Sequence, residues 1–195
     1  LGNGNGSFKA TQSYVSGDNV GLELADVNAD GYLDFISNDN AGGKYNVALG
    51  NTNGTFKLAT SYATVANAWS VKLKDLNNDG IADLVTSSNT SGAVSIHFGN
   101  GNGTFKAGTS FNAGPAAIRD LQIFDYNSDG SFDLLAASAS DNSVSVVLGN
   151  GNGTFKARTS LAAGDLAVSV AISDINENGL IDIVSASFND DRISV

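Results

Sequence analysis

The feature that most constrains this chain is an internal repeat. The segment Leu1–Lys9, LGNGNGSFK, returns in closely similar form at Leu49, Phe98 and Leu148. Residues 1–195 therefore form a single repeat domain, divided into the units 1–48, 49–97, 98–147 and 148–195. Every unit has to adopt the same local structure, and neighbouring units have to bury one another's apolar faces.

Each unit has the pattern of four short β-strands. Apolar residues alternate before an acidic loop, as in residues 21–25, and apolar pairs follow that loop, as at 84–85. A third alternating run, such as 143–148, ends in a glycine–asparagine turn. A fourth strand is predicted to start at the phenylalanine after each turn, namely Phe8, Phe56, Phe105 and Phe155.

These patterns predict an all-β fold made of four repeats of a four-stranded antiparallel blade. Blades of this length are typical of β-propellers. The 23 glycines and the single proline fit short strands joined by tight turns. Two arrangements remain open, a closed ring of blades or part of a longer repeat array.

The most specific chemical signal is a nine-residue acidic loop in each unit, with oxygen-bearing side chains at positions 1, 3, 5 and 9 and a glycine at position 6. Calcium prefers six to eight oxygen ligands, and a tight loop can also offer the carbonyl of position 7. The sequence therefore predicts about one Ca²⁺ per repeat, and up to four in the chain. The predicted metal ligands are Asp26, Asn28, Asp30, Tyr32 and Asp34; Asp75, Asn77, Asp79, Ile81 and Asp83; Asp125, Asn127, Asp129, Ser131 and Asp133; and Asp174, Asn176, Asn178, Leu180 and Asp182.

Charge supports this interpretation. The net charge is −10, and 11 of the 20 acidic residues occupy ligand positions, so four Ca²⁺ ions would bring the charge to about −2. The fourth loop has Asn178 where the others have aspartate, and it is predicted to be the weakest site. Position 12 carries no bidentate glutamate and strands flank the loop, which excludes an EF-hand. The alternative is a set of solvated Asp-Asn-Asp-Gly turns.

The pattern Asp-x-Asn-x-Asp-Gly-x-x-Asp, together with the Leu/Phe-Gly-Asn-Gly-x-Gly-Thr-Phe turn, resembles the FG-GAP-like (VCBS-type) repeat family, related to the blades of the integrin alpha-chain head. The resemblance covers the whole chain. It implies calcium-stabilised β-propeller blades in extracellular or cell-surface proteins, used in adhesion and in binding carbohydrate or protein, with mainly structural metals. Propellers of the family usually have seven blades, whereas four units are present here.

Composition excludes several other classes. The acidic charge argues against nucleic acid as a partner, and no apolar run is long enough for a membrane span or a signal peptide. There is no cysteine, so any metal must be held by oxygen. His97 aligns with Val147 and is interpreted as a strand residue. Without recurring Ser-His-Asp groups, the chain is predicted not to be an enzyme.

Recognition is expected where residue character varies on a constant scaffold. The position six residues before each loop holds Val20, Trp69, Arg119 and Val168. Trp69 and Arg119 are therefore candidate contacts for a carbohydrate or protein ligand, although a lone aromatic can also fill a packing gap. Two functions stay open: an adhesive, lectin-like binding module, or a structural protein that joins further copies of itself head to tail into a fibre or surface array.

Overall fold

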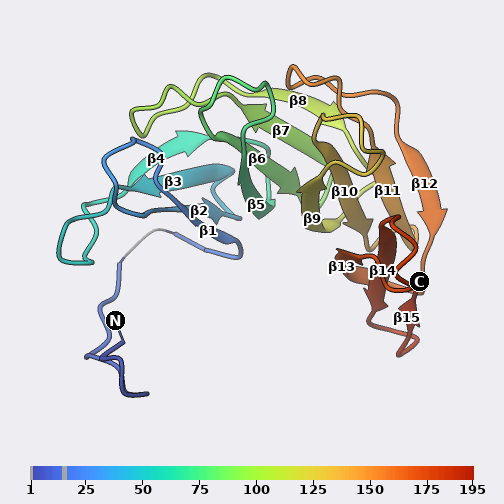
Figure 1. Cartoon of the computed structure of the whole chain (residues 1–195), viewed down its shortest axis with the longest axis horizontal. Coiled ribbons are helices and arrows are strands. Elements are labelled where there is room, and N and C mark those ends of the chain that lie inside the picture. The colour runs from blue at the N-terminus through green and yellow to red at the C-terminus, as the bar shows by residue number, and fades with distance from the viewer. Residues whose placement is uncertain (1, 15–16) are drawn as a thin grey trace.

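The computed structural model describes residues 2–14 and 17–195, and in these ranges the secondary structure consists of β-strands. Leu1, where the first glycine–asparagine turn was predicted to begin, lies outside the described residues. The strands form four antiparallel sheets that follow one another around an arc (Figure 1). No helix in the described part of the chain has the length and apolarity needed to cross a membrane.

Each sheet is one blade. The first blade contains β1 (Leu22–Ala25), β2 (Asp34–Asp39), β3 (Lys44–Ala48) and β4 (Thr60–Ala63). The second contains β5 (Ala68–Lys74), β6 (Asp83–Ser88), β7 (Ala93–His97) and β8 (Thr109–Asn112). The third contains β9 (Ile118–Phe124), β10 (Asp133–Ser138), β11 (Ser143–Val147) and β12 (Thr159–Ala162). The last contains β13 (Ala167–Ser173), β14 (Asp182–Ser187) and β15 (Ile193–Ser194).

Neighbouring strands in each sheet are also neighbours in the sequence, so every blade is a simple antiparallel meander. This confirms the all-β fold of repeated blades. The last blade has three strands among the described residues, not the predicted four. The sheets do not close into a ring: the N-terminal segment lies at one end of the arc and the last blade at the other (Figure 1).

The fourth strand begins later than predicted. Phe56 forms an isolated bridge with Gly50, and β4 starts at Thr60. The reason is local: the Lys57 amide donates to the Leu49 carbonyl at 2.8 Å, so the chain closes its turn before it joins the sheet. Each fourth strand therefore pairs with β-strands of the preceding sequence unit. Phe8 likewise makes a bridge to Gly2 and does not begin a strand.

The core lies between blades. Val71 and Leu84 of the second blade pack against Ile36, Tyr45 and Val47 of the first, and related clusters join the later blades. Because a central blade is covered on both faces, all six residues of β6 are buried. Burial of these apolar faces is the main term that holds neighbouring repeats together.

The first blade differs in one respect. The alternating residues of β1 were predicted to face the core, yet Leu22 and Leu24 are 62% and 52% exposed. The equivalent Val71 in β5 is buried. The pattern of the strand is the same, but no blade formed by the described residues covers this face of the first sheet.

Candidate functional site

Each acidic loop connects the first strand of its blade to the second and folds its side chains onto its own backbone. In the first loop, Asp26 accepts hydrogen bonds from the amides of Asp30 (3.1 Å) and Gly31 (2.7 Å). Asn28 Oδ1 also accepts from the Asp30 amide at 3.0 Å, and Asp30 Oδ1 accepts from the Tyr32 amide at 2.9 Å. The oxygens of positions 1, 3 and 5 are thereby held along one short stretch of chain.

The other three loops repeat this network. The amide of the position-6 glycine donates to the position-1 aspartate at 2.7–2.8 Å in every copy. In the fourth loop, Asn178 Oδ1 accepts from the Leu180 amide at 2.8 Å, as the aspartate does elsewhere. The side-chain amide of Asn178 therefore preserves the loop conformation without a carboxylate, and the weaker cation site there stays a prediction.

Two loop positions adopt left-handed backbone conformations. Gly31 has φ +87°, and a Cβ built on it would meet nothing within 4 Å, so the dihedral alone favours glycine. Position 4 is also left-handed, with φ 59° at Ala29, although no single residue type recurs there in the four loops. The corresponding Asn78 is a residue type that tolerates this conformation, and it was the one available clue.

Position 9 has a different environment. Asp34 is fully buried, and it accepts the amide of Val27 at 3.0 Å and that of Gly50 at 2.7 Å. Gly50 belongs to the glycine–asparagine turn, so the carboxylate ties the loop to that turn. The equivalent bonds are made by Asp83 with Leu76 and Gly99, and by Asp133 with Tyr126 and Gly149. Asp182 accepts the Ile175 amide at 2.9 Å and is partly exposed.

The pKa shifts of the loop carboxylates differ between positions 1 and 5, where they are downward, and position 9, where the shift is upward. The Gly31 amide hydrogen bond lowers the pKa of Asp26, and the Asn127 side chain lowers that of Asp129. Burial raises the pKa of Asp83, and the nearby Asp79 and Asp75 carboxylates raise it further. The carboxylates of Asp26 and Asp129 are therefore anionic at neutral pH, and a cation bound in either loop would be attracted to that charge.

The donor set fits a hard cation. Side-chain oxygens at positions 1, 3 and 5 each retain lone pairs after accepting one amide, and oxygen is the donor that calcium prefers. Within residues 2–14 and 17–195, however, no three histidine, cysteine or acidic side chains are already grouped as metal ligands. The position-9 carboxylate faces backbone amides, so a cation at positions 1, 3 and 5 would also need backbone carbonyl or water oxygens.

The structure brings together the two candidate ligand-binding residues. Trp69 lies near the start of β5 and Arg119 near the start of β9, at the opposite end of these strands from the acidic loops. The guanidinium carbon lies 4.9 Å from the centre of the indole ring, a cation–π contact between neighbouring blades. Arg119 Nε is buried and has no hydrogen-bond partner within residues 2–14 and 17–195.

His97 is a strand residue, as predicted, and is buried in β7. Its Nε2 lies 3.1 Å from the hydroxyls of both Thr64 and Ser95, and its Nδ1 lies 3.3 Å from the Lys106 carbonyl. The carbonyl can only accept, so Nδ1 carries the hydrogen and Nε2 accepts from a hydroxyl. Burial lowers the pKa of His97 and keeps the ring neutral.

This histidine should make stability depend on pH. Its pKa is lower in the folded chain than the ordinary 6.5, so the unfolded chain binds more protons and acid favours unfolding. We expect the unfolding free energy to fall below about pH 6.5, by at most about 1.4 kcal/mol per pH unit from this one group. Urea titrations at several pH values give the unfolding free energy as a function of pH. This free energy should fall less steeply with decreasing pH in His97→Val than in the native chain. Identical slopes would contradict the assignment.

Repeated antiparallel blades, each with an acidic Asx-rich loop, define a β-propeller-like repeat protein. Residues 26–86, 75–136 and 125–185 each match the FG-GAP-like repeat. These matches span most of the chain, which therefore belongs to the FG-GAP-like repeat family and confirms the resemblance seen in the sequence. A comparison with curated proteins found no match.

Several solved structures share the fold. An Agrocybe aegerita lectin, described as specifically recognising non-reducing terminal N-acetylglucosamine, has a TM-score of 0.56 and 25% identity over 83% of this chain. BBS1N, solved in complex with ARL6DN, has a TM-score of 0.59 at 10% identity over 89% of this chain. The Photorhabdus luminescens Tc holotoxin pore has a TM-score of 0.53 at 17% identity over 88%. The present chain spans 45%, 55% and 8% of these three chains, respectively.

Proposed function

We propose that this chain is a non-enzymatic, calcium-stabilised module of the extracellular space or cell surface that binds a carbohydrate or protein ligand. The observation that carries the proposal is the contact between Trp69 and Arg119. An indole face and a guanidinium are held together by two neighbouring blades, and the buried Nε of Arg119 has no acceptor among the described residues. Indole rings stack on the apolar faces of sugars, and Trp and Arg are also frequent anchors in protein interfaces.

Calcium has a structural role in this proposal. The loops lie at the opposite end of the strands from Trp69 and Arg119, so bound cations would fix the blades without touching the ligand. Short loops with few carboxylates are expected to bind Ca²⁺ with dissociation constants of about 10⁻⁴ to 10⁻³ M. Such sites fill at the calcium concentrations found outside cells, which supports an extracellular location.

Carbohydrate is the ligand class to test first, because the lectin neighbour recognises a terminal sugar and has the highest identity among the structures described above. Isothermal titration of the chain with an oligosaccharide that ends in N-acetylglucosamine should give saturable binding. Trp69→Ala should weaken it at least about tenfold, since loss of a central aromatic anchor typically costs 1–2 kcal/mol or more. Val168→Ala, at the equivalent position of the last blade, is the matched control and should leave binding unchanged.

The possible outcomes separate the ligand classes. Binding that survives Trp69→Ala would exclude the proposed site. If no oligosaccharide binds, whichever sugar it ends in, carbohydrate is rejected as the ligand class. Protein ligands would then be tested with the same pair of variants. Circular dichroism of both variants should match the native spectrum, because Trp69 is only partly buried.

A further inference from the structure

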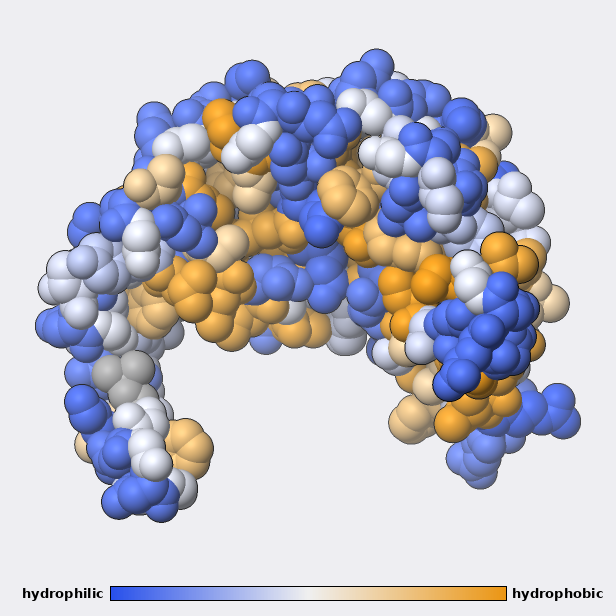
Figure 2. All heavy atoms as spheres, in the orientation of Figure 1, coloured by the Kyte–Doolittle hydropathy of each residue, from blue (hydrophilic) through white to orange (hydrophobic). Residues whose placement is uncertain are grey.

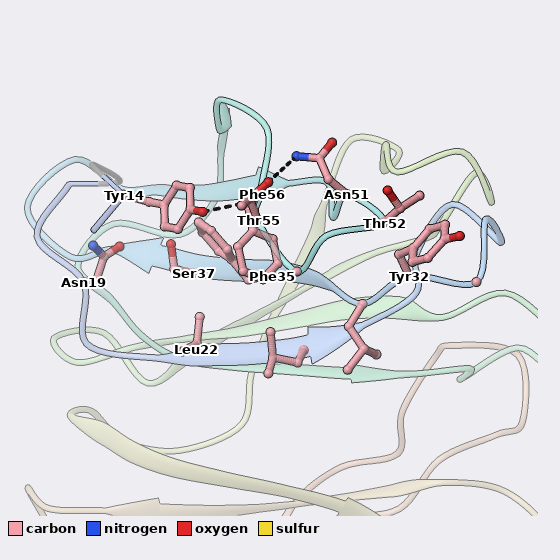
Figure 3. A pocket seen from close by; sticks show the side chains of 14 residues that line it. Tyr14, Asn19, Leu22, Tyr32, Phe35, Ser37, Asn51, Thr52, Thr55 and Phe56 are labelled. Atoms are coloured by element: carbon pink, nitrogen blue, oxygen red, sulfur yellow. Dashed lines mark hydrogen bonds between the residues drawn. The ribbon is translucent and has the colours of Figure 1, made fainter. Parts of the chain in front are cut away.

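Two of the cavities in this chain differ in the polar groups on their walls. One, of about 800 Å³, lies on the first blade beside Leu22, Phe35 and Phe56 (Figure 3). Figure 2 shows hydrophobic residues gathered over this blade. Tyr14 also lines the cavity, but its hydroxyl accepts the Phe56 amide at 3.1 Å and donates to Gln12 at 3.1 Å. This tyrosine hydroxyl is therefore already paired within the chain.

The second cavity, of about 500 Å³, lies between the first and second blades. Its aromatic walls are Tyr45 and Tyr62 of the first blade and His97 and Phe105 of the second. Tyr45 and Tyr62 are stacked with ring centres 5.2 Å apart, and Tyr45 meets His97 edge to face at 5.0 Å. The tryptophan–arginine contact described above involves none of the described residues that line this cavity, so the two sites are separate.

One wall of this cavity departs from the repeated scaffold. A Cβ built on Gly108 would overlap the His97 imidazole and lie 2.5 Å from Ser95 Oγ, so the chain can pass over the histidine only with a glycine there. In the next unit the same two positions hold Val147 and Arg158. The histidine and the glycine therefore form a matched pair that the fold of the next unit does not need.

The most informative polar group in the cavity is the hydroxyl of Tyr45. Tyr45 is 1% exposed, yet its hydroxyl has no hydrogen-bond partner within residues 2–14 and 17–195. Burial raises the pKa of Tyr45, so the hydroxyl stays protonated and able to donate. Because buried tyrosine hydroxyls are usually paired, this one calls for a partner from outside the chain.

Other hydroxyls in the cavity can both donate and accept. His97 Nε2 lies 3.1 Å from the hydroxyls of Thr64 and Ser95 but has a single lone pair, so it accepts from only one of them. Thr64 also lies 2.6 Å from the Thr86 hydroxyl, which gives its hydrogen two alternative directions. The Thr64 hydroxyl can therefore switch between donor and acceptor when a molecule enters.

The charges around the cavity favour an uncharged ligand. No acidic side chain is among the described residues that line it. Lys106 lines it, but the Lys106 ammonium lies 6.0 Å from the ring centre of Phe98, which lines a different cavity. The cavity therefore presents neutral hydroxyls and aromatic rings, and its volume falls in the range of roughly 300–1,000 Å³ that is usual for small-molecule sites.

We propose that this cavity binds a neutral sugar unit, as a second site on the chain. The sugar hydroxyls pair with those of Tyr45 and Thr64, and the apolar face of the sugar ring packs on Tyr62. Neutral sugars suit such walls because each ring carries hydroxyls that both donate and accept, together with a C–H face that stacks on aromatic rings. The site is independent of Trp69, so either site can fail without the other.

The chain carries one histidine and one tryptophan, so NMR can observe the two sites separately. The imidazole resonances of His97 report on the cavity, and the indole N–H resonance of Trp69 reports on the other site. The untagged chain is titrated into the millimolar range with the methyl glycosides of glucose, galactose, mannose and N-acetylglucosamine. At least one of these glycosides should shift the His97 resonances and reach saturation.

Tyr45→Phe tests the role of the hydroxyl. The substitution keeps the aromatic stack and should weaken the binding observed at His97 by about 3- to 10-fold, the effect of one lost hydrogen bond. The melting temperature should not fall, because the hydroxyl has no partner in the described part of the fold. Tyr126→Phe, at a tyrosine that lines a different cavity, is the control and should bind as the native chain does.

Three outcomes would overturn the proposal. They are a titration in which no glycoside shifts the His97 resonances, one in which only the Trp69 indole shifts, and a Tyr45→Phe variant that binds as tightly as the native chain. The second outcome would leave the function proposed above in place, because it would assign the sugar to Trp69 alone.

Discussion

Removal of calcium is expected to lower the unfolding free energy of this chain by about 4–8 kcal/mol. A ligand that binds the folded state alone stabilises it by RT ln(1 + [L]/Kd). At ~5 mM calcium and dissociation constants of about 10⁻⁴ to 10⁻³ M, each loop contributes about 1–2 kcal/mol. For a chain of this size, thermal melts in calcium and in excess EGTA should differ by roughly 10–30 °C.

Two controls test whether the stabilisation comes from calcium bound in the acidic loops. Magnesium should restore little of the lost stability, because it demands near-octahedral geometry and shorter bonds than a flexible loop provides. Asn178→Asp gives the fourth loop the carboxylate that the other loops have, and it should increase the calcium-dependent part of the stability. An unchanged melting temperature in EGTA would refute the metal interpretation of all four loops.

The sequence predicted most of the architecture because the repeat displays each local pattern four times. Alternation identified the strands, and the glycine that recurs at loop position 6 coincides with left-handed backbone at Gly31. The fourth strand was placed too early because an apolar residue after a turn usually begins a strand. Phe56 instead belongs to the closure of its turn, which depends on a backbone hydrogen bond between Lys57 and Leu49 that no side-chain pattern reveals.

The candidate sites were predictable in kind but not in arrangement. Trp69 and Arg119 were selected separately, as variable residues at equivalent positions, and their contact depends on how neighbouring blades pack. The burial of the position-9 aspartates was also missed. A signal for it exists: the aspartate and the turn glycine recur 16 residues apart, as in Asp83 and Gly99, and the structure joins them by a hydrogen bond. Sequence periodicity marks such positions without showing which groups meet.

This pairing predicts a large loss of stability on replacement of Asp83 by alanine. The carboxylate is fully buried and accepts the amides of Leu76 at 3.0 Å and Gly99 at 2.9 Å. Its removal leaves two buried N–H groups without acceptors, each worth about 1–3 kcal/mol, so the unfolding free energy should fall by about 2–6 kcal/mol. Urea unfolding measures this as a lower midpoint at an unchanged slope.

Asp182→Ala is the matched control, because Asp182 occupies the same loop position, is partly exposed and, among the described residues, accepts one backbone amide, that of Ile175. Loss of the Asp182 carboxylate should lower the unfolding free energy by about 1 kcal/mol. Both variants are compared in EGTA, where calcium contributes nothing. A large deficit of Asp83→Ala that persists in EGTA identifies position 9 as the group that ties the acidic loop to the turn. A deficit present only in calcium would instead assign Asp83 to the metal, since the two amides lose their acceptor under both conditions.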